Sequence, residues 1–245
     1  MGQIVRSLIL GVLFLIGTGS LNAETDTISA AGGEIRITPI VHGSVQLEYG
    51  DVVIQVDPWS RGDYTDAPKA NLILVTDIHG DHLDPEAIGS LSQKDTVVVV
   101  SESVAEQLGS GIVLANGESH EVAGVLIEAV PMYNFERGPE AGKLFHDKGR
   151  GNGYLLTLGG KKIYLAGDTA CIPEMKALED IDVAFVPMNL PYTMPPDEAA
   201  ECVAAFKPGI VYPYHYLGSD LEVFKAGLRD VPEVEVRIRE WYPGS

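Results

Sequence analysis

The sequence has few cysteines and few basic residues. Two cysteines among 245 residues exclude a disulfide-rich scaffold. Against 35 aspartates and glutamates there are only 17 lysines and arginines, which gives a formal net charge of −18. A chain this acidic repels phosphate backbones, so nucleic acid and anionic membrane surfaces are unfavourable partners. Hydrophobic residues still make up 45% of the chain, so a disordered protein is excluded as well.

The first 23 residues have the order of a signal peptide. Arg6 precedes an apolar run over residues 8–16, which is too short to span a bilayer, and small residues lead to a cleavage region around Ala23. An uncleaved anchor helix is the alternative. We therefore expect an exported protein, periplasmic or secreted, without stable membrane association after signal removal. There Cys171 and Cys202 could be oxidised, although their spacing leaves two buried thiols open.

Residues 24–245 are expected to form one domain, because no linker, low-complexity run or internal repeat interrupts them. The hydrophobic pattern predicts strands over residues 35–38, 44–49, 52–56, 72–75, 96–100, 162–166 and 210–213. It predicts short helices over residues 102–108, 172–178, 196–206 and 221–228. Early hairpins followed by alternating strands and helices indicate an α/β or α+β fold in which helices cover packed sheets.

A dense group of histidines and carboxylates follows the predicted strand at 72–75. Residues 76–84 read Thr-Asp-Ile-His-Gly-Asp-His-Leu-Asp, with two imidazoles and three carboxylates. These groups are ligands of Zn²⁺ and its first-row neighbours, and a loop can turn several of them inward. As an alternative, Asp81 or Asp84 caps a helix that begins near Pro85, and the histidines are exposed.

Two later predicted strands also end in polar residues, at Gly167-Asp168-Thr169 and at Tyr214-His215-Tyr216. Functional side chains gather on the loops at one end of the strands, so three strand ends can converge on one site. The ordered set His-x-Asp-His, Gly-Asp-Thr and Pro-x-His resembles the metallo-β-lactamase superfamily. More narrowly, the segments 42–44, 56–58, 192–194, 198–200 and 213–216 resemble its ascorbate-6-phosphate lactonase-like branch.

That resemblance implies a four-layer αβ/βα sandwich with a metal site at the edge between its two sheets. Carried over by position, His79 belongs to a first metal site and Asp168 bridges the first site to a second one. The second site takes Asp81, His82 and His215. The resemblance also implies a metal-dependent hydrolase.

Two positions depart from the family pattern, and both belong to the first site. Asp77 stands where the family usually has its first histidine, and Asn134 stands where a further histidine is expected. A carboxylate and an amide make this site harder, which disfavours Zn²⁺ relative to Mn²⁺ or Fe²⁺. His146 could substitute as a ligand, or it has an outer or exposed role.

The expected function is hydrolysis of a small ester, lactone or similar bond by a metal-bound hydroxide, with a small molecule as partner. One or two ions are expected, with Zn²⁺ first and Mn²⁺ or Fe²⁺ as alternatives. Asp81 would orient the hydroxide or move its proton, and His42 would meet the substrate oxyanion from the opposite rim or merely support its turn. The alternatives are a phosphodiesterase and a non-catalytic metal- or ligand-binding protein. A β-lactamase ranks low because of Asp77 and Asn134, and the oligomeric state cannot be read from the chain.

Other conspicuous residues are expected to have simple roles. His120 lies in a polar turn and is expected at the surface. Gly149, Gly151 and Gly153 resemble a phosphate loop only superficially, because the segment precedes a strand and does not open a helix. Arg150, between these glycines, and Lys148 remain candidates to meet an anionic substrate.

Overall fold

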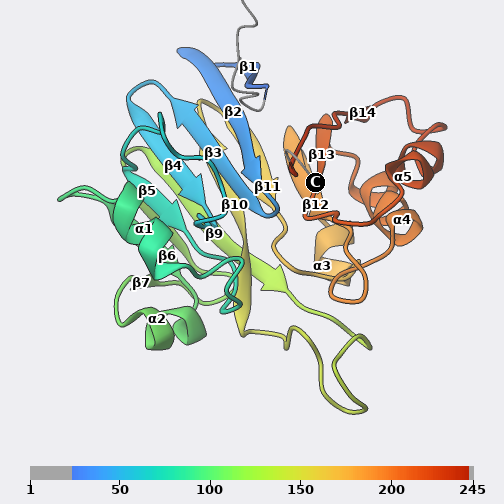
Figure 1. Ribbon diagram of the computed structural model, residues 1–245. Helices are drawn as coiled ribbons and strands as arrows, with labels where there is room; N and C mark the ends of the chain where they lie inside the picture. The colour runs from blue at the N-terminus through green and yellow to red at the C-terminus, as the bar shows by residue number, and fades with distance from the viewer. Residues whose placement is uncertain (1–23, 243–245) are drawn as a thin grey trace, which may run out of the picture.

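The computed structural model describes residues 24–242 and contains two seven-stranded sheets packed face to face (Figure 1). The predicted signal peptide lies outside the described residues. The strands of the first sheet follow one another in space as they do in the chain, from β1 to β7, and those of the second sheet run from β14 to β8. Each half of the chain therefore forms its own sheet.

The first sheet begins with antiparallel hairpins and ends with parallel strands. Its strands are β1 (Asp26–Ala30), β2 (Gly33–Val41), β3 (Ser44–Tyr49), β4 (Val52–Val56), β5 (Leu72–Leu74), β6 (Val97–Val100) and β7 (Ile112–Val113). Strands β1 to β4 pair antiparallel, and β4 to β7 pair parallel. Helices α1 (Pro85–Leu91) and α2 (Glu102–Leu108) connect parallel strands, as such crossovers require.

The second sheet repeats this plan. Its strands are β8 (Ser119–Val122), β9 (Val125–Met132), β10 (Gly151–Leu158), β11 (Lys161–Leu165), β12 (Val183–Pro187), β13 (Ile210–Tyr214) and β14 (Glu235–Val236). Strands β8 to β11 pair antiparallel, and β11 to β14 pair parallel. The helices of this half are α3 (Pro173–Lys176), α4 (Pro196–Phe206) and α5 (Leu221–Gly227).

Local sequence explains where the first helix begins. The Asp84 carboxylate accepts hydrogen bonds from the backbone N–H groups of Glu86 at 3.0 Å and Ala87 at 3.1 Å. Pro85 stands in the first turn, where its missing N–H costs no helical hydrogen bond. The capping alternative therefore holds for Asp84, which separates this carboxylate from the candidate metal ligands.

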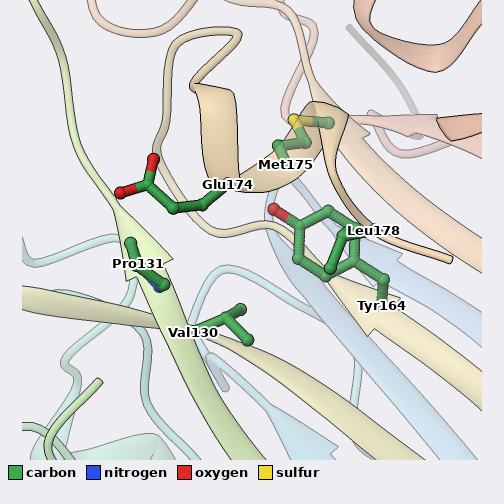
Figure 2. Close-up of a pocket in the computed structure, with 6 residues that line it drawn as sticks. All are labelled: Val130, Pro131, Tyr164, Glu174, Met175 and Leu178. Carbon is green, nitrogen blue, oxygen red and sulfur yellow. The ribbon is translucent and has the colours of Figure 1, made fainter. Parts of the chain in front are cut away.

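The helices form the two outer layers, with α1 and α2 on one side and α3 to α5 on the other (Figure 1). A small cavity of about 50 Å³ lies where α3 packs on β9 and β11 (Figure 2). It is lined by Val130, Pro131, Tyr164, Glu174, Met175 and Leu178. This volume suits a few water molecules and is far below that of an ordinary ligand pocket. None of the predicted site residues lines it.

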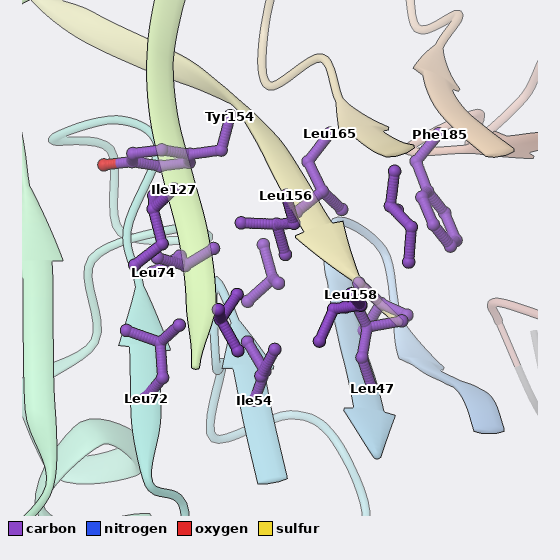
Figure 3. Packing of buried hydrophobic residues seen from close by; sticks show 14 of the residues in the cluster. Leu47, Ile54, Leu72, Leu74, Ile127, Tyr154, Leu156, Leu158, Leu165 and Phe185 are labelled. Atoms are coloured by element: carbon purple, nitrogen blue, oxygen red, sulfur yellow. The ribbon is translucent and has the colours of Figure 1, made fainter. Parts of the chain in front are cut away.

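The largest apolar core lies between the two sheets. Leu47 and Ile54 from the first sheet pack with Leu156 and Phe185 from the second (Figure 3). The order of layers is therefore helix, sheet, sheet, helix, and the predicted four-layer arrangement is confirmed. Among the described residues, no helix is both long enough and apolar enough to cross a membrane.

Candidate metal centre

The candidate site lies at one edge of the sandwich, where strands of both sheets end. Asp57 follows β4, the segment 76–84 follows β5, and Asp168 and His215 follow β11 and β13. The N-terminal and C-terminal parts of the chain are joined here by a backbone hydrogen bond of 2.9 Å, from the N–H of His215 to the carbonyl oxygen of His42. Segments far apart in the chain therefore bring their side chains to one place, as the strand ends predicted.

Asp168 lies at the centre of this edge. Its Oδ1 is 3.3 Å from His215 Nε2. Its Oδ2 is 3.3 Å from His82 Nε2 and 3.1 Å from His146 Nε2. Three imidazoles from three different loops thus face one buried carboxylate, and the bridging role of Asp168 stays a prediction.

The facing atoms are buried and lack hydrogen-bond partners among the described residues. They are His82 Nε2, His146 Nε2, His215 Nε2 and Asp168 Oδ1. Each buried polar atom without a partner costs about 1–3 kcal/mol, so four at one point call for a group that all of them can bind. A divalent cation fits, because imidazole nitrogens and carboxylate oxygens are metal ligands.

The candidate ligands fall into two halves that share Asp168. The first half is Asp77, His79 and His146, whose ligand atoms lie within 4.8 Å of one another. The second half is Asp81, His82 and His215. In this half, two groups of three residues could hold an ion. One is His82, Asp168 and His215, the other is His42, Asp81 and His215, and in each the ligand atoms lie within 4.8 Å of one another.

In the second half, His82 is oriented by an outer carboxylate. Its Nδ1 lies 2.8 Å from Asp57 Oδ2, which also accepts from Thr76 Oγ1 at 2.6 Å. The bond fixes the proton of His82 on Nδ1 and leaves Nε2 available to a cation. Burial would lower the pKa of His82, but the carboxylates of Asp168 and Asp57 raise it well above its ordinary value. A bound cation would therefore displace a proton from this ring.

His215 has an outer amide instead of a carboxylate. Its Nδ1 lies 3.5 Å from the side-chain amide of Asn189. The Asn189 amide is placed in the orientation in which its nitrogen and its oxygen both have hydrogen-bond partners. Its nitrogen then donates to the carbonyl oxygens of Leu217 at 3.2 Å and Leu190 at 3.1 Å. Its oxygen then faces His215 Nδ1, which again leaves Nε2 available to a cation.

The backbone at this edge adopts an uncommon conformation. Six non-glycine residues have positive φ in the described chain, and His42, Asp57 and His215 are three of them, with φ between 44° and 54°. Such a conformation costs about 1–3 kcal/mol and persists only where the surrounding structure enforces it. These three residues are therefore held in place by the tertiary structure.

In the first half, His146 fills the place that Asn134 leaves. The imidazole is fully buried, and its Nε2 lies 3.8 Å from Asp77 Oδ2. Its Nδ1 donates to Asn134 Oδ1 at 2.7 Å, while the Asn134 amide nitrogen donates to the carbonyl oxygen of Tyr192 at 2.9 Å. Both ends of the Asn134 amide are thus engaged. His146 is the candidate ligand, and Asn134 orients it.

Asp77 already has a cationic partner. Arg150 donates from Nε to Asp77 Oδ1 at 3.0 Å and from Nη2 to Oδ2 at 2.8 Å, and His79 Nδ1 lies 2.9 Å from the same Oδ2. Burial would raise the pKa of Asp77, but the hydrogen bond with His79 and the charges of His146 and Arg150 lower it. The first half therefore presents a carboxylate whose charge is largely neutralised.

Asp81 is the most accessible carboxylate of the site, with 30% of its side chain exposed. Burial would raise its pKa, but hydrogen bonds with His215 and His42 hold the pKa well below its usual range. His42 Nε2 lies 3.1 Å from Asp81 Oδ2, and His42 Nδ1 lies 2.7 Å from the Tyr242 hydroxyl. His42 thus lies beside Asp81 and not across the site from it. This arrangement suits a residue that positions Asp81 better than one that meets an oxyanion from the opposite rim.

The site carries an excess of negative charge. The carboxylates of Asp57, Asp77, Asp81 and Asp168 converge with a single guanidinium, that of Arg150. Burial would raise the pKa of Asp168, but the three facing imidazoles hold it well below its ordinary value. One or two divalent cations would offset this charge, which agrees with the unpartnered ligand atoms.

The remaining predictions concern residues outside the cluster. His120 is exposed, as predicted, although it lies on β8 and not in a turn. The glycine-rich segment leads into β10, and a Cβ on Gly151 would lie 2.5 Å from the Thr76 carbonyl oxygen. This glycine therefore permits a close approach of two chain segments. Lys148 pairs with Glu174 at 2.5 Å and Arg150 pairs with Asp77, so each already has a carboxylate partner.

Cys171 and Cys202 form a disulfide, with their Cα atoms 5.5 Å apart. The bond links the segment that follows Asp168 to helix α4. The sequence left this pairing open, because a separation of 31 residues does not fix the distance between two thiols.

Residues 36–215 match the family model described as the beta-lactamase superfamily domain. A UPF0173 metal-dependent hydrolase of Thermococcus onnurineus is 32% identical over 219 residues, which cover 82% of this chain and 95% of the relative. One from Thermus thermophilus is 32% identical over 193 residues, which cover 74% of this chain and 84% of the relative.

Solved structures of similar proteins point to the same superfamily. The crystal structure of a proposed metal-dependent hydrolase from Parabacteroides distasonis aligns with a TM-score of 0.84 and 46% identity, covering 90% of this chain and 100% of that one. Igni18, a metallo hydrolase from Ignicoccus hospitalis, aligns with a TM-score of 0.70 and 24% identity, covering 83% of this chain and 94% of that one, which supports the fold. The superfamily predicted from the motifs is confirmed.

Proposed function

Because this chain belongs to the beta-lactamase superfamily and is a metal-dependent hydrolase, we propose that it cleaves a small ester or lactone bond outside the cytoplasm. The observation that carries the proposal is the convergence of three unpartnered imidazole nitrogens on Asp168. Such a cluster holds a cation in the position from which it can act on a substrate that enters from the sheet edge.

The second half is proposed to hold the more tightly bound ion, with Zn²⁺ as the first choice and Mn²⁺ or Fe²⁺ as alternatives. His82, His215 and the carboxylates of Asp81 and Asp168 supply a mixed nitrogen and oxygen donor set that all three ions accept. The first half, where Arg150 neutralises Asp77, would hold a second ion more weakly.

A bound ion would lower the pKa of a water molecule and polarise the scissile carbonyl group. Asp81 lies 3.5 Å from His215 Nε2 and is partly open to solvent, so its carboxylate can orient the attacking water and accept its proton. His42 holds Asp81 in this orientation through the 3.1 Å contact, and Tyr242 holds His42. His42 and Tyr242 are therefore proposed as positioning residues.

An ester or lactone is favoured over a phosphodiester because the basic residues near the site are engaged. Arg150 binds Asp77, Lys148 pairs with Glu174, and a third cation, Arg137, pairs with Glu198 at 2.6 Å. Enzymes that transfer phosphoryl groups stabilise the transferred anion with arginine, lysine or metal ions. These three cations are already paired with carboxylates, which supports a substrate without a phosphate group.

Hydrolysis is tested with metal-loaded protein against aryl esters, lactones, thioesters, bis(p-nitrophenyl) phosphate and a β-lactam. We expect turnover of esters or lactones that disappears after chelation and returns with added metal. The Asp168→Ala variant is the control, because it removes the carboxylate shared by both halves. Activity that survives this substitution comes from a contaminant, and turnover of the phosphodiester alone would replace the ester proposal.

Export is proposed on two grounds. The first 23 residues have the order of a signal peptide, and the disulfide between Cys171 and Cys202 suits an oxidising compartment. Mass spectrometry of protein recovered from the native host's periplasm or medium should find a mature chain that begins near Glu24 and contains no free thiol. A full-length chain with two alkylated cysteines, recovered from the cytoplasm, would contradict export.

A further inference from the structure

Four exposed apolar side chains lie on the loops that hold the metal centre. They are Phe135, Leu190, Tyr192 and Leu217, with exposed fractions of 51%, 51%, 45% and 54%, and we call them the apolar rim. Among the described residues, the other large apolar side chains with comparable exposure are Val113, Leu126 and Val223, which lie on β7, β9 and α5 and not on the loops that carry or support the candidate ligands. Exposed apolar groups gathered at a site usually mark a binding surface.

Three of the rim residues, Leu190, Tyr192 and Leu217, are each one hydrogen-bonded side chain away from a histidine of the site. Asn189 bonds the carbonyl oxygens of Leu190 and Leu217 and faces His215. The N–H of Leu217 also donates at 3.0 Å to the Tyr242 hydroxyl, the group that contacts His42. The rim is therefore built into the support of the second half.

The same loop reaches the first half. The carbonyl oxygen of Tyr192 accepts from Asn134, which orients His146, and the Tyr192 ring packs on Phe145 with ring centroids 5.0 Å apart. Thr193 fixes the loop from within, because its buried hydroxyl accepts from the Asn189 N–H at 2.7 Å. The loop over residues 189–193 thus spans both halves and holds its apolar side chains toward solvent.

The ion pairs near the rim disfavour an anionic occupant. The nearby cations Arg137, Lys148 and Arg150 are all paired with carboxylates. Arg61 lies over the Trp59 ring, with its guanidinium carbon 4.7 Å from the ring centroid. An apolar and uncharged group can contact the rim without separating any of these ion pairs, whereas an anionic group would have to compete with them.

We infer that the substrate carries an alkyl or acyl chain, which packs on the apolar rim while the ester or lactone carbonyl faces the metal centre. This inference rests on the proposed function and names the substrate class within it. Leu190, Leu217 and Tyr192 would then be specificity-determining residues. Complete burial of a methylene group corresponds to about fourfold in binding, so contact on one side corresponds to about twofold.

The test measures kcat/KM of metal-loaded protein on p-nitrophenyl esters from acetate to octanoate, below their micellar concentrations. We expect kcat/KM to rise about twofold per methylene, or about 60-fold over the series. The Leu190→Ser/Leu217→Ser double variant should flatten this dependence, with the loss growing as the chain lengthens. Leu126→Ser is the matched control, because Leu126 is an exposed leucine at the start of β9, whereas the candidate site lies beyond the end of this strand. Tyr192→Ser repeats the test if the double variant does not fold.

A binding measurement separates this inference from the proposed function. Alkyl hydroxamates bind divalent ions through two oxygens, so calorimetry can compare acetohydroxamate with octanohydroxamate on metal-loaded protein. If octanohydroxamate binds more tightly than acetohydroxamate, this difference requires the rim, and no ester is turned over, then the proposed ester or lactone cleavage is wrong. The inference that the substrate carries an apolar chain would still stand. Ester turnover with no dependence on chain length would overturn the inference alone. A preference for bis(p-nitrophenyl) phosphate that is lost in Arg61→Gln would overturn both the ester proposal and the inference.

Discussion

The two halves of the metal centre contain the same types of ligand but differ in their surroundings. Each half supplies one carboxylate and two histidines, and both share Asp168. In the second half the imidazoles of His82 and His215 are buried, and the Asp81 carboxylate is held by imidazoles. In the first half His79 is 41% exposed, and Asp77 is bound at both oxygens by Arg150.

This difference indicates that the surroundings of the ligands, as well as their kind, affect how tightly each half binds an ion. A carboxylate already paired with a guanidinium gains less from a metal ion than one that faces only imidazoles, because part of its electrostatic energy is already satisfied. An exposed histidine must also be ordered before it binds. We therefore expect the second half to bind its ion first and more tightly.

The largest effect should come from removing a histidine of the second half. His82→Ala is expected to weaken binding of the tight ion by more than about 100-fold, the upper limit for changes outside the ligand sphere, and to abolish hydrolysis. His79→Ala is the matched change in the first half and should remove only the weaker ion. Metal content per chain after dialysis, measured by mass spectrometry, checks both. Equal metal loss in the two variants would contradict the difference between the halves.

The outer carboxylate should have the next largest effect. Asp57→Asn keeps the size of the side chain but removes the charge that stabilises the proton on His82 Nδ1. We expect about 10–100-fold weaker binding of the tight ion, measured by competition with a chelator. Asn134→Leu, the corresponding change behind His146, should affect only the weaker ion. A loss of the tight ion in Asn134→Leu would show that the halves are not separate.

A change at Arg150 should act in the opposite direction. Arg150→Gln removes the positive charge from Asp77 and is expected to tighten binding of the second ion by about tenfold, since the Asp77 carboxylate would no longer be shared with a guanidinium. Arg150→Lys keeps the charge and is the control, which should resemble the unchanged protein. Calorimetric titration of a second equivalent of Zn²⁺ reports the affinity. Weaker binding in Arg150→Gln would mean that Arg150 supports the ion by orienting Asp77.

The smallest effect is expected at Tyr242, which contacts His42 beside the second half of the site. Tyr242→Phe removes the hydroxyl that contacts His42, and one such hydrogen bond contributes about 1 kcal/mol, so kcat should fall about three- to tenfold. Metal content should not change, because the Tyr242 hydroxyl contacts His42, a proposed positioning residue. Tyr216→Phe is the matched control, since its hydroxyl donates to the Arg239 carbonyl oxygen, away from the ligands. An equal loss in both variants would indicate a general effect on the packing of the C-terminal segment.

Much of the fold was predictable from hydrophobic pattern. The predicted bounds of β3, β4, α2 and α4 agree with the structure, and those of β5, β6, β11, β13 and α5 differ by one residue at one end or at both. Strand β2 is longer than predicted, because its pairing with β1 and β3 continues past the apolar run. Strands β7 and β14 were missed because each has two residues and exists only through pairing with its neighbour. Strands β1, β8, β9 and β12 were not predicted either.

The candidate site was less uniformly predictable. The candidate ligands next to strand ends, such as His82 and Asp168, could be named because chemistry-bearing residues follow apolar runs and match an ordered family pattern. Asn189 and Tyr242 gave no signal, because their roles depend on hydrogen bonds to residues far away in the chain. The Tyr242 contact, for example, joins residues separated by 200 positions. Asp57 lay in a recognised motif, but only its 2.8 Å contact with His82 reveals what it does.

The sequence by itself determined the superfamily, the layered fold and most of the candidate metal-binding histidines, because these depend on local hydrophobic pattern and on the order of short motifs. The tertiary structure decided how the unusual first half is completed. It brings His146 to the place of the missing histidine, turns Asn134 into its support and pairs Arg150 with Asp77 across 73 residues of chain. These outcomes depend on which side chains meet within about 3 Å, and that distance is set by the packing of two sheets.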